Sequence, residues 1–341
     1  MKGNFLMILS LLDLFADNAI DRFLGNVEHT QPNYCHYLSV GDLCHTTLNF
    51  ADLPEKKSGT MRVIVVSDTH ERHTKLHGLP AGDVFIHCGD ILMTSRVFSV
   101  KAGIRKLYWF NEWMKDIPCK HKLVIAGNHD GIMEKIGKDA VQKILSNAIY
   151  LENSLIEIDQ IKVWGTPYST GKSINKAFQS DKFSTATIGN APTSGVDILL
   201  THGQCPELEE MVPHSVHLWG HSHSSYGIRM PPTILKGKPV LNLSICVPIM
   251  DKNFRPTHLP VVLDISAASR DFQQFSPDSV SVVDGDLEVI ALNKIKGKLS
   301  SSPYRKSWLS RLTSSTSVSE SPEEIDRRSI TSKISITSRP S

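Results

Sequence analysis

The sequence has few of the features that mark a secreted or membrane protein. Its six cysteines are scattered over 341 residues, with no Cys-x-x-Cys pair and no dense spacing of the kind found in disulfide-stapled domains. This pattern favours buried thiols in a reducing compartment, with Cys88 and Cys246 in apolar runs as the first candidates. No apolar stretch approaches the length of a transmembrane helix. We therefore expect a cytoplasmic protein.

The chain also has little net charge. Its 37 basic and 35 acidic residues give a formal net charge of +2, so charge alone implies no surface for a polyanion. Nucleic-acid binding and a nuclease groove gain no support from this composition.

The length allows one large domain with extensions, or two small domains. We expect residues 1–58 to be an N-terminal extension that contains a short amphipathic helix. Apolar residues around Phe5–Leu12 fall on one helical face and Asp13 follows them, which favours this helix over a secretory signal. A domain over residues 59–266 follows. Residues 267–341 form a Ser/Thr-rich tail that we expect to be largely disordered.

The central segment contains apolar, largely β-branched runs that are typical of strands buried on both faces. These runs cover residues 61–67, 84–88, 122–126, 196–200, 216–219, 240–243 and 261–264. Apolar spacing predicts a helix over 97–115 and a shorter one over 137–145, and residues 155–158 with 161–164 predict a hairpin. Residues 166–195, rich in Ser, Thr, Gly and Asn, predict a long loop that faces substrate. This order of elements favours an α/β sandwich with two packed sheets.

Five short polar pieces each follow a strand-like run. They are Asp68-Thr69-His70, Gly89-Asp90, Gly127-Asn128-His129-Asp130, Thr201-His202 and Gly220-His221-Ser222-His223. Sites in open α/β sheets form at the carboxyl ends of strands, so we expect these pieces to meet. Their carboxylates, amide oxygen and imidazoles suit Mn, Fe, Zn or Ni rather than Ca.

The residue types predict two metal ions. Asp90 is the expected bridge, because one carboxylate can bind two cations through its two oxygens. The other predicted ligands divide into two sets, one for each metal: Asp68, His70 and His223, and Asn128, His202 and His221. Two metals about 3.5–4 Å apart would polarise phosphoryl oxygens and activate a bridging water.

Taken singly, these residues carry much less information. A lone His70 or His202 is more often a surface or core histidine than a ligand, and a lone Asp68 could merely cap a turn. His129 alone is evenly balanced between catalysis and a supporting hydrogen bond. Asn242 is evenly balanced between a substrate contact and a strand-end turn. Because five such pieces occur in order at strand ends, a metal site is favoured for these residues as a group.

In this order, the pieces DxH, GD, GNHD, THG and GHSH resemble the signature of the calcineurin-like metallophosphoesterase superfamily over about residues 61–264. The resemblance implies that residues 59–266 form a four-layer α/β/β/α sandwich of two mixed sheets flanked by helices. It implies two divalent ions, Mn²⁺, Fe²⁺/³⁺ or Zn²⁺, on the seven predicted ligands. His129 would be the catalytic histidine that stabilises the transition state or protonates the leaving oxygen. Asn128 and His129 would also bind a small phosphoester substrate.

A closer likeness is to the metallophosphoesterase domain-containing family. The stretches that carry it are Val65–His70, Val124–His129, Asp197–Gly203, Gly220–Gly227 and Asn242–Cys246. That family implies a metal-dependent phosphodiesterase that acts on cyclic nucleotides by attack of a metal-bound hydroxide. Some members carry glycine where His221 stands, which weakens their activity. This chain keeps the histidine, so the resemblance implies an active site.

Two alternatives remain beside the phosphodiesterase. A catalytically silent scaffold with this fold would have lost ligands or the catalytic histidine, and this chain has lost neither. A phosphomonoesterase or nuclease would use the same metal site with a different pocket. A phosphoprotein phosphatase is disfavoured, because Ile91, Leu92 and Met93 stand after Gly89-Asp90 in place of the GDxxDRG pattern.

Overall fold

The computed structural model describes residues 28–41, 44–93, 99–171, 173–229, 232–235, 238–241 and 243–267. The predicted N-terminal helix, the predicted tail from residue 268 onward and Asn242 lie outside the described residues. The described helices are α2 (Val100–Lys115), α3 (Gly131–Ile136), α4 (Lys138–Ile144), α5 (Asp181–Gly189) and α6 (Pro206–Met211), with short 3₁₀ turns at η1 (Phe50–Asp52) and η2 (His73–Lys75).

The first sheet has the strand order β2-β1-β15-β3-β4-β5-β6. Its strands are β1 (Tyr34–Ser39), β2 (Cys44–Asn49), β3 (Thr60–Val66), β4 (Gly82–His87), β5 (Cys119–Val124), β6 (Ile149–Tyr150) and β15 (Val261–Ser266). Strands β3, β4, β5 and β6 run parallel to one another. The loops that follow β3, β4 and β5 therefore leave the sheet at one edge.

The second sheet has the order β11-β14-β10-β9-β8-β7. Its strands are β7 (Ser154–Ile158), β8 (Ile161–Thr166), β9 (Val196–Thr201), β10 (His214–Trp219), β11 (Gly227–Arg229) and β14 (Leu243–Cys246). Strands β8, β9, β10 and β14 are parallel, so the loops after β9 and β10 also share an edge. The predicted hairpin is present, and both residues of its turn, Asp159 and Gln160, have positive φ as a tight two-residue hairpin turn requires.

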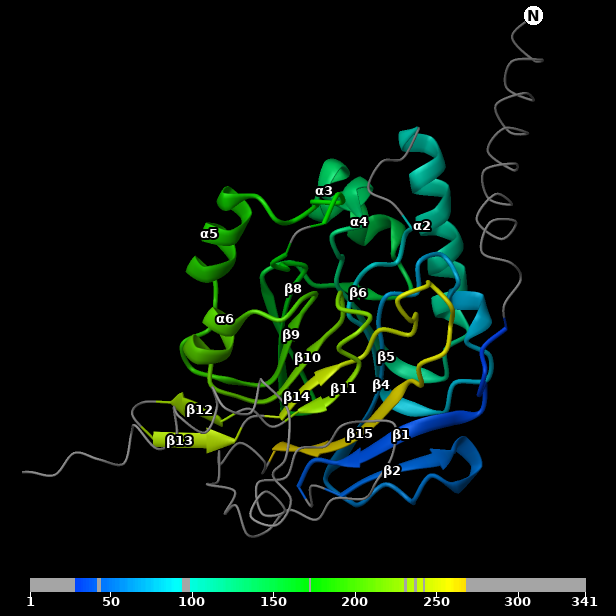
Figure 1. Cartoon of the computed structure of the whole chain (residues 1–341), viewed down its shortest axis with the longest axis vertical. Helices are drawn as coiled ribbons and strands as arrows, with labels where there is room; N and C mark the ends of the chain where they lie inside the picture. Colours follow the sequence, from blue (N-terminus) through cyan, green and yellow to red (C-terminus); the bar gives the residue numbers. More distant parts are fainter. Residues whose placement is uncertain are drawn as a thin grey trace, which may run out of the picture. The chain divides into compact units, whose positions relative to one another are not determined.

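Side chains alternate between two cores along the central strands. On β3, Val63 and Val65 join the core between the two sheets, whereas Ile64 and Val66 join the core beneath the helices of the first sheet. Helices α2, α3 and α4 cover that outer face, and α5 and α6 pack on the outer face of the second sheet (Figure 1). The predicted sandwich of two mixed sheets flanked by helices is confirmed.

Three local features differ from the sequence expectation. The first sheet includes β1 and β2, from residues that the sequence places before the domain. The segment 166–195 is not a loop throughout, because it contains the helix α5. The hydroxyl of Ser180 caps the start of this helix. The single strand expected over 240–243 is two strands, β13 (Lys238–Leu241), which pairs with β12 (Pro232–Leu235), and β14. Among the described helices, none combines the length and apolarity needed to cross a bilayer.

Candidate metal centre

The five polar pieces lie in the loops after β3, β4, β5, β9 and β10, at the edges where parallel strands end. Several of their residues adopt the left-handed backbone region, which is uncommon for residues other than glycine. They are Asp68 (φ 53°), His70 (φ 43°), Asp90 (φ 54°) and His221 (φ 65°). Backbone strain of this kind gathers at functional sites, because the surrounding structure must compensate for it.

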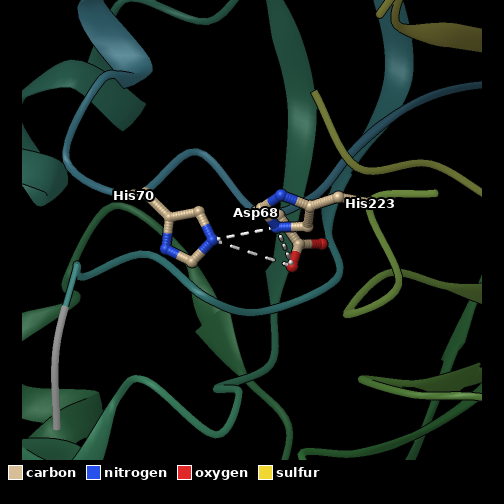
Figure 2. Close-up of side chains that lie close together, drawn as sticks. All are labelled: Asp68, His70 and His223. Carbon is tan, nitrogen blue, oxygen red and sulfur yellow. Dashed lines mark hydrogen bonds and ion pairs between the residues drawn. The ribbon is translucent and has the colours of Figure 1, made fainter. Parts of the chain in front are cut away.

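Asp68, His70 and His223 form the first cluster of potential ligands. The Nε2 atoms of His70 and His223 lie 3.1 Å apart, and Oδ1 of Asp68 lies 3.4 Å from Nε2 of His223. Figure 2 shows the two imidazoles pointing toward one another beside the Asp68 carboxylate. Asp68 and His70 are buried, and His223 is largely covered. Three donor atoms thus converge on one small volume.

Asp90, His202 and His221 form a second cluster, and Asn128 joins it through its amide oxygen. The Nε2 atom of His202 lies 3.2 Å from Oδ1 of Asp90 and 3.0 Å from Oδ1 of Asn128. The Nδ1 atom of His221 lies 2.7 Å from the same Asn128 oxygen. His221 therefore faces this cluster through Nδ1, whereas His202 faces it through Nε2.

Asp90 connects the two clusters. Its Oδ1 faces His202, while its Oδ2 lies 3.9 Å from Nε2 of His70 and 3.9 Å from Nε2 of His129. Asp90 also accepts a hydrogen bond from the backbone N–H of His129 at 2.8 Å, which fixes the carboxylate. A carboxylate that presents one oxygen to each cluster has the geometry of a bridging ligand.

Backbone carbonyls fix the orientation of three of the imidazoles. The Nδ1 atoms of His70, His202 and His223 lie 2.9–3.0 Å from the carbonyl oxygens of Leu92, Cys88 and Asp251. Because a carbonyl can only accept, each Nδ1 must carry the proton, and in the neutral ring Nε2 keeps its lone pair. Second contacts of this kind are the usual support of metal-bound histidine.

The amide of Asn128 is oriented in the same way. Its Nδ2 donates to Oγ of Ser173 and to the carbonyl oxygen of Asn175, both at 3.1 Å. The amide oxygen must then point toward His202 and His221. Ser173 and Asn175 belong to the segment before α5, so this segment lies directly against the site.

Asp130 ties two of the loops together. Its Oδ2 accepts hydrogen bonds from the N–H groups of Gly127 at 2.8 Å and Ile91 at 3.2 Å, and its Oδ1 accepts from the N–H of Leu92 at 2.8 Å. The loops after β4 and β5 are therefore held at a fixed separation. This contact sets the relative positions of Asp90 and Asn128.

Two glycines are required by close approach. A Cβ atom at Gly220 would strike Ser67 and the carboxylate of Asp68, and one at Gly127 would strike Asp90. A side chain at either position would displace a predicted ligand. The sequence pieces therefore place glycine where the loops of the site pass closest to each other.

The donor set fits divalent cations. Burial lowers the pKa of His70 to about 3 and that of His221 to about 4, so both rings are neutral near pH 7. Burial also opposes charge on His202, but the carboxylate of Asp90 outweighs it and raises the pKa of His202 to about 9. The Asp68 carboxylate likewise raises the pKa of His223 against the effect of burial. In each cluster, a carboxylate thus stabilises a positive charge close to the ligand atoms. The nitrogen and oxygen donors of the two clusters suit Mn, Fe or Zn.

His129 lies at the rim of the two clusters. Its ring packs edge-on against His70 at 4.7 Å between centroids, and its Nδ1 lies 2.5 Å from the carbonyl oxygen of Met93. The side chain keeps 15% of its surface exposed, more than the neighbouring His70. It is therefore within reach of a molecule that enters from solvent.

The structure brings together all eight described residues of the predicted site: Asp68, His70, Asp90, Asn128, His129, His202, His221 and His223. Their roles as ligands and catalyst stay predictions. Sequence reasoning missed the supporting residues Ser173, Asn175 and Asp251. The sequence carries no local signal for them, because each acts on a residue that is 28 or more positions away.

Residues 61–225 match the family model described as calcineurin-like phosphoesterase. All eight site residues fall within the matched region. Residues 61–225 therefore form a calcineurin-like phosphoesterase domain, and the resemblance predicted from the five motifs is confirmed. This family uses divalent metals, and membership indicates a phosphoester hydrolase.

Among individual proteins, the chain is similar to human Metallophosphoesterase domain-containing protein 1, with 29% identity over 258 residues that cover 62% of this chain and 72% of that protein. It is also 27% identical to a Caenorhabditis elegans UPF0046 protein over 243 residues, which cover 60% of this chain and 81% of the relative. A solved archaeal phosphodiesterase aligns with 60% of this chain and all of its own, at 16% identity and a TM-score of 0.28.

Proposed function

We propose that the protein hydrolyses phosphodiesters with two divalent cations bound in the candidate metal centre. One observation carries this proposal: Asp90 presents one carboxylate oxygen to each of two clusters of imidazole and carboxylate donors. The likeness to the metallophosphoesterase domain-containing family supports it. Two cations on a shared carboxylate provide the charge that hydrolysis of a phosphoester requires.

The predicted ligands divide between the two cations as the clusters do. One cation would be held by Asp68, His70 and His223. The other would be held by Asn128, His202 and His221. Asp90 would bind both cations. When bound, such cations polarise the phosphoryl oxygens and lower the pKa of a bridging water. We favour Mn²⁺, with Fe or Zn as the other candidates.

His129 has the position of a proton donor. Its Nδ1 donates to the carbonyl of Met93, so Nε2 is the atom that faces Asp90 and the clusters. When the ring takes up a second proton, on Nε2, that proton can pass to the oxygen that leaves phosphorus, which is general acid catalysis. Asn128 would contribute to binding the phosphate as well as a cation.

We further propose cyclic nucleotides as the substrate class, on the likeness to the metallophosphoesterase domain-containing family. The proposed location is the cytoplasm. Burial raises the pKa of the Cys88 and Cys246 thiols well above the ordinary value, and neither is disulfide-bonded. Protonated, covered thiols of this kind suit a reducing compartment.

The test is Mn²⁺-dependent hydrolysis of bis(p-nitrophenyl) phosphate beside p-nitrophenyl phosphate. We expect the diester to be turned over preferentially. That result would justify a screen of 2′,3′- and 3′,5′-cyclic nucleotides. Preference for the monoester would point to a phosphatase. No turnover of either ester by the metal-loaded protein would contradict the proposal and favour a scaffold.

A further inference from the structure

A cavity of about 480 Å³ adjoins the metal centre at His223. We call it the side cavity, and its wall includes Gln31, His36, Tyr226, Lys252 and His258 besides His223. His223 faces Asp68 and His70 through Nε2, so it belongs to both the cavity wall and the first cluster. The side cavity is therefore separated from the first cluster by no more than the His223 ring. The volume lies within the range of small-molecule sites.

Most of the side cavity is built by residues outside the matched family region, 61–225. Gln31 and His36 come from the segment before it, where β1 carries His36 into the first sheet. Lys252 and His258 come from the segment after it. Apart from the loop that carries His223 and Tyr226, the elements that shape this neighbouring space are distinct from those that hold the predicted metal ligands.

One wall of the side cavity is aromatic. The rings of Tyr226 and His258 are stacked, with centroids 4.2 Å apart and planes 8° from parallel. Tyr226 is held by its hydroxyl, which donates to the carbonyl of Leu259 at 2.9 Å and accepts from its N–H at 3.0 Å. His258 donates from Nδ1 to the carbonyl of Pro248 at 3.0 Å. A stacked pair in which each ring is held by a hydrogen bond to the backbone is a surface on which a flat ring can stack.

The rest of the lining is polar with little negative charge. Burial lowers the pKa of His36 to about 3, so this imidazole is neutral near pH 7. The carboxylate of Asp251 is turned back to its own loop, where Oδ1 accepts from the N–H groups of Asn253 and Arg255 at 2.8 and 2.9 Å. Lys252, next to it, is exposed at the cavity. The lining therefore suits a polar ring system attached to an anionic phosphate.

We propose that the side cavity binds the nucleoside part of a nucleotide phosphodiester, with the base on the Tyr226–His258 stack and the phosphate at the metal centre. This inference rests on the proposed function. It assigns substrate selection to Gln31, His36 and residues 251–259, outside the matched phosphoesterase region. The segment before residue 61 then shapes the substrate site as well as extending the first sheet.

Two substrates with the same leaving group test the proposal. Thymidine 5′-monophosphate p-nitrophenyl ester and methyl p-nitrophenyl phosphate both release p-nitrophenol and differ in the group that remains on phosphorus. We expect the Mn²⁺-loaded full-length protein to show a kcat/KM about 10-fold higher for the thymidine ester, because stacking of one base contributes this much. Equal kcat/KM values for the two esters would overturn the proposal.

Gln31→Trp is the informative variant, because Gln31 is exposed and a larger side chain there would occupy part of the side cavity while every predicted ligand is kept. It should reduce the ratio of the two kcat/KM values toward 1. Asn33→Trp, two residues along at another exposed position, is the matched control and should keep the ratio. An unchanged ratio in Gln31→Trp would contradict the assignment of the base to this cavity.

A binding measurement separates this inference from the proposed function. Calorimetry on the Mn²⁺-loaded protein compares thymidine 5′-monophosphate with ribose 5-phosphate, and needs no turnover. Tighter binding of the nucleotide, lost in Gln31→Trp, supports the side cavity even if neither ester is hydrolysed. Equal binding of the two compounds would sink the inference even if the diester is hydrolysed.

Discussion

The Nε2 atoms of His70 and His223 lie 3.1 Å apart, while the Nδ1 atom of each ring donates to a backbone carbonyl. When both rings are neutral, two lone pairs face each other, and a positive charge between them relieves the repulsion. Oδ1 of Asp68, 3.4 Å from His223, adds negative charge at the same point. This relationship is the simplest reason to expect a cation in the first cluster.

Replacement of His129 should separate metal binding from catalysis. His129→Ala removes the proposed proton donor but none of the predicted ligands. We expect kcat for diester hydrolysis to fall by about 10²–10⁴-fold, the usual contribution of a general acid. The metal content of the purified variant should equal that of the wild type. Undiminished kcat with a full complement of metal would remove His129 from the mechanism.

Replacement of Ser173 tests the support of Asn128. Ser173→Ala removes the hydroxyl oxygen that accepts from Nδ2 of Asn128. We expect the affinity of the second cluster for Mn²⁺ to fall by roughly 10-fold, as losses of such supporting contacts usually do. Thr170→Ala is the control, because that hydroxyl donates to the carbonyl of Gln204 instead. Equal Mn²⁺ affinities in the two variants, by calorimetry, would argue against this role.

Alanine in place of two different glycines should have different effects on stability and metal binding. Gly220→Ala forces a methyl group against Ser67 and Asp68, whereas a methyl group at Gly189, at the end of α5, meets open space. We expect Gly220→Ala to lower the free energy of unfolding by about 1–3 kcal/mol and to weaken metal binding. Gly189→Ala should leave metal binding unchanged. Urea unfolding and Mn²⁺ titration of both variants measure the contrast, and similar results for the two would refute the close packing.

The stability of the protein should fall in mild acid, partly through His73. This ring is buried against Trp109 and Trp113, and among the described residues neither of its nitrogens has a hydrogen-bond partner. Burial lowers its pKa to about 3. Between pH 6.5 and 3 the unfolded chain binds a proton that the folded chain does not, so the free energy of unfolding decreases as pH falls.

His73→Leu should weaken this pH dependence by about 1 kcal/mol between pH 7.5 and 5.5. The measurement is urea unfolding at both pH values for wild type and variant, and the comparison cancels the titration of the metal centre. His77→Leu is the control, because the His77 side chain is 67% exposed. Identical pH dependence in wild type and His73→Leu would show that folding does not lower the pKa of His73.

Most of the fold could be predicted because its central strands are buried on both faces. Val63, Ile64, Val65 and Val66 are all apolar since they face two cores, and such a run is legible in the sequence. Strand β2 could not be predicted from the sequence, because Cys-His-Thr-Thr-Leu-Asn contains few apolar residues. This strand depends on its pairing with β1. Helix α5 was missed for a similar reason, since its polar sequence buries little beyond Thr187.

The clustering of the site residues could also be predicted, because each follows a parallel strand and strand ends meet at one edge. The residues that orient these side chains could not be predicted from the sequence. Asp251 acts on His223 through a backbone carbonyl, which any residue type supplies, so its side chain gives no signal. Ser173 and Asn175 lie in a segment whose composition is that of an ordinary surface loop. Contacts of this kind follow from the three-dimensional path of the chain rather than from local pattern.

The most direct test of the account is to count the metal ions and follow activity as they bind. Metal-free protein is titrated with Mn²⁺, bound metal is measured after desalting, and turnover of bis(p-nitrophenyl) phosphate is recorded at each step. We predict two equivalents bound in the wild type, with activity that rises as the second binds, and fewer than two in Asp90→Asn, with activity lost. Two equivalents and full turnover in Asp90→Asn would contradict a centre built on the shared Asp90 carboxylate.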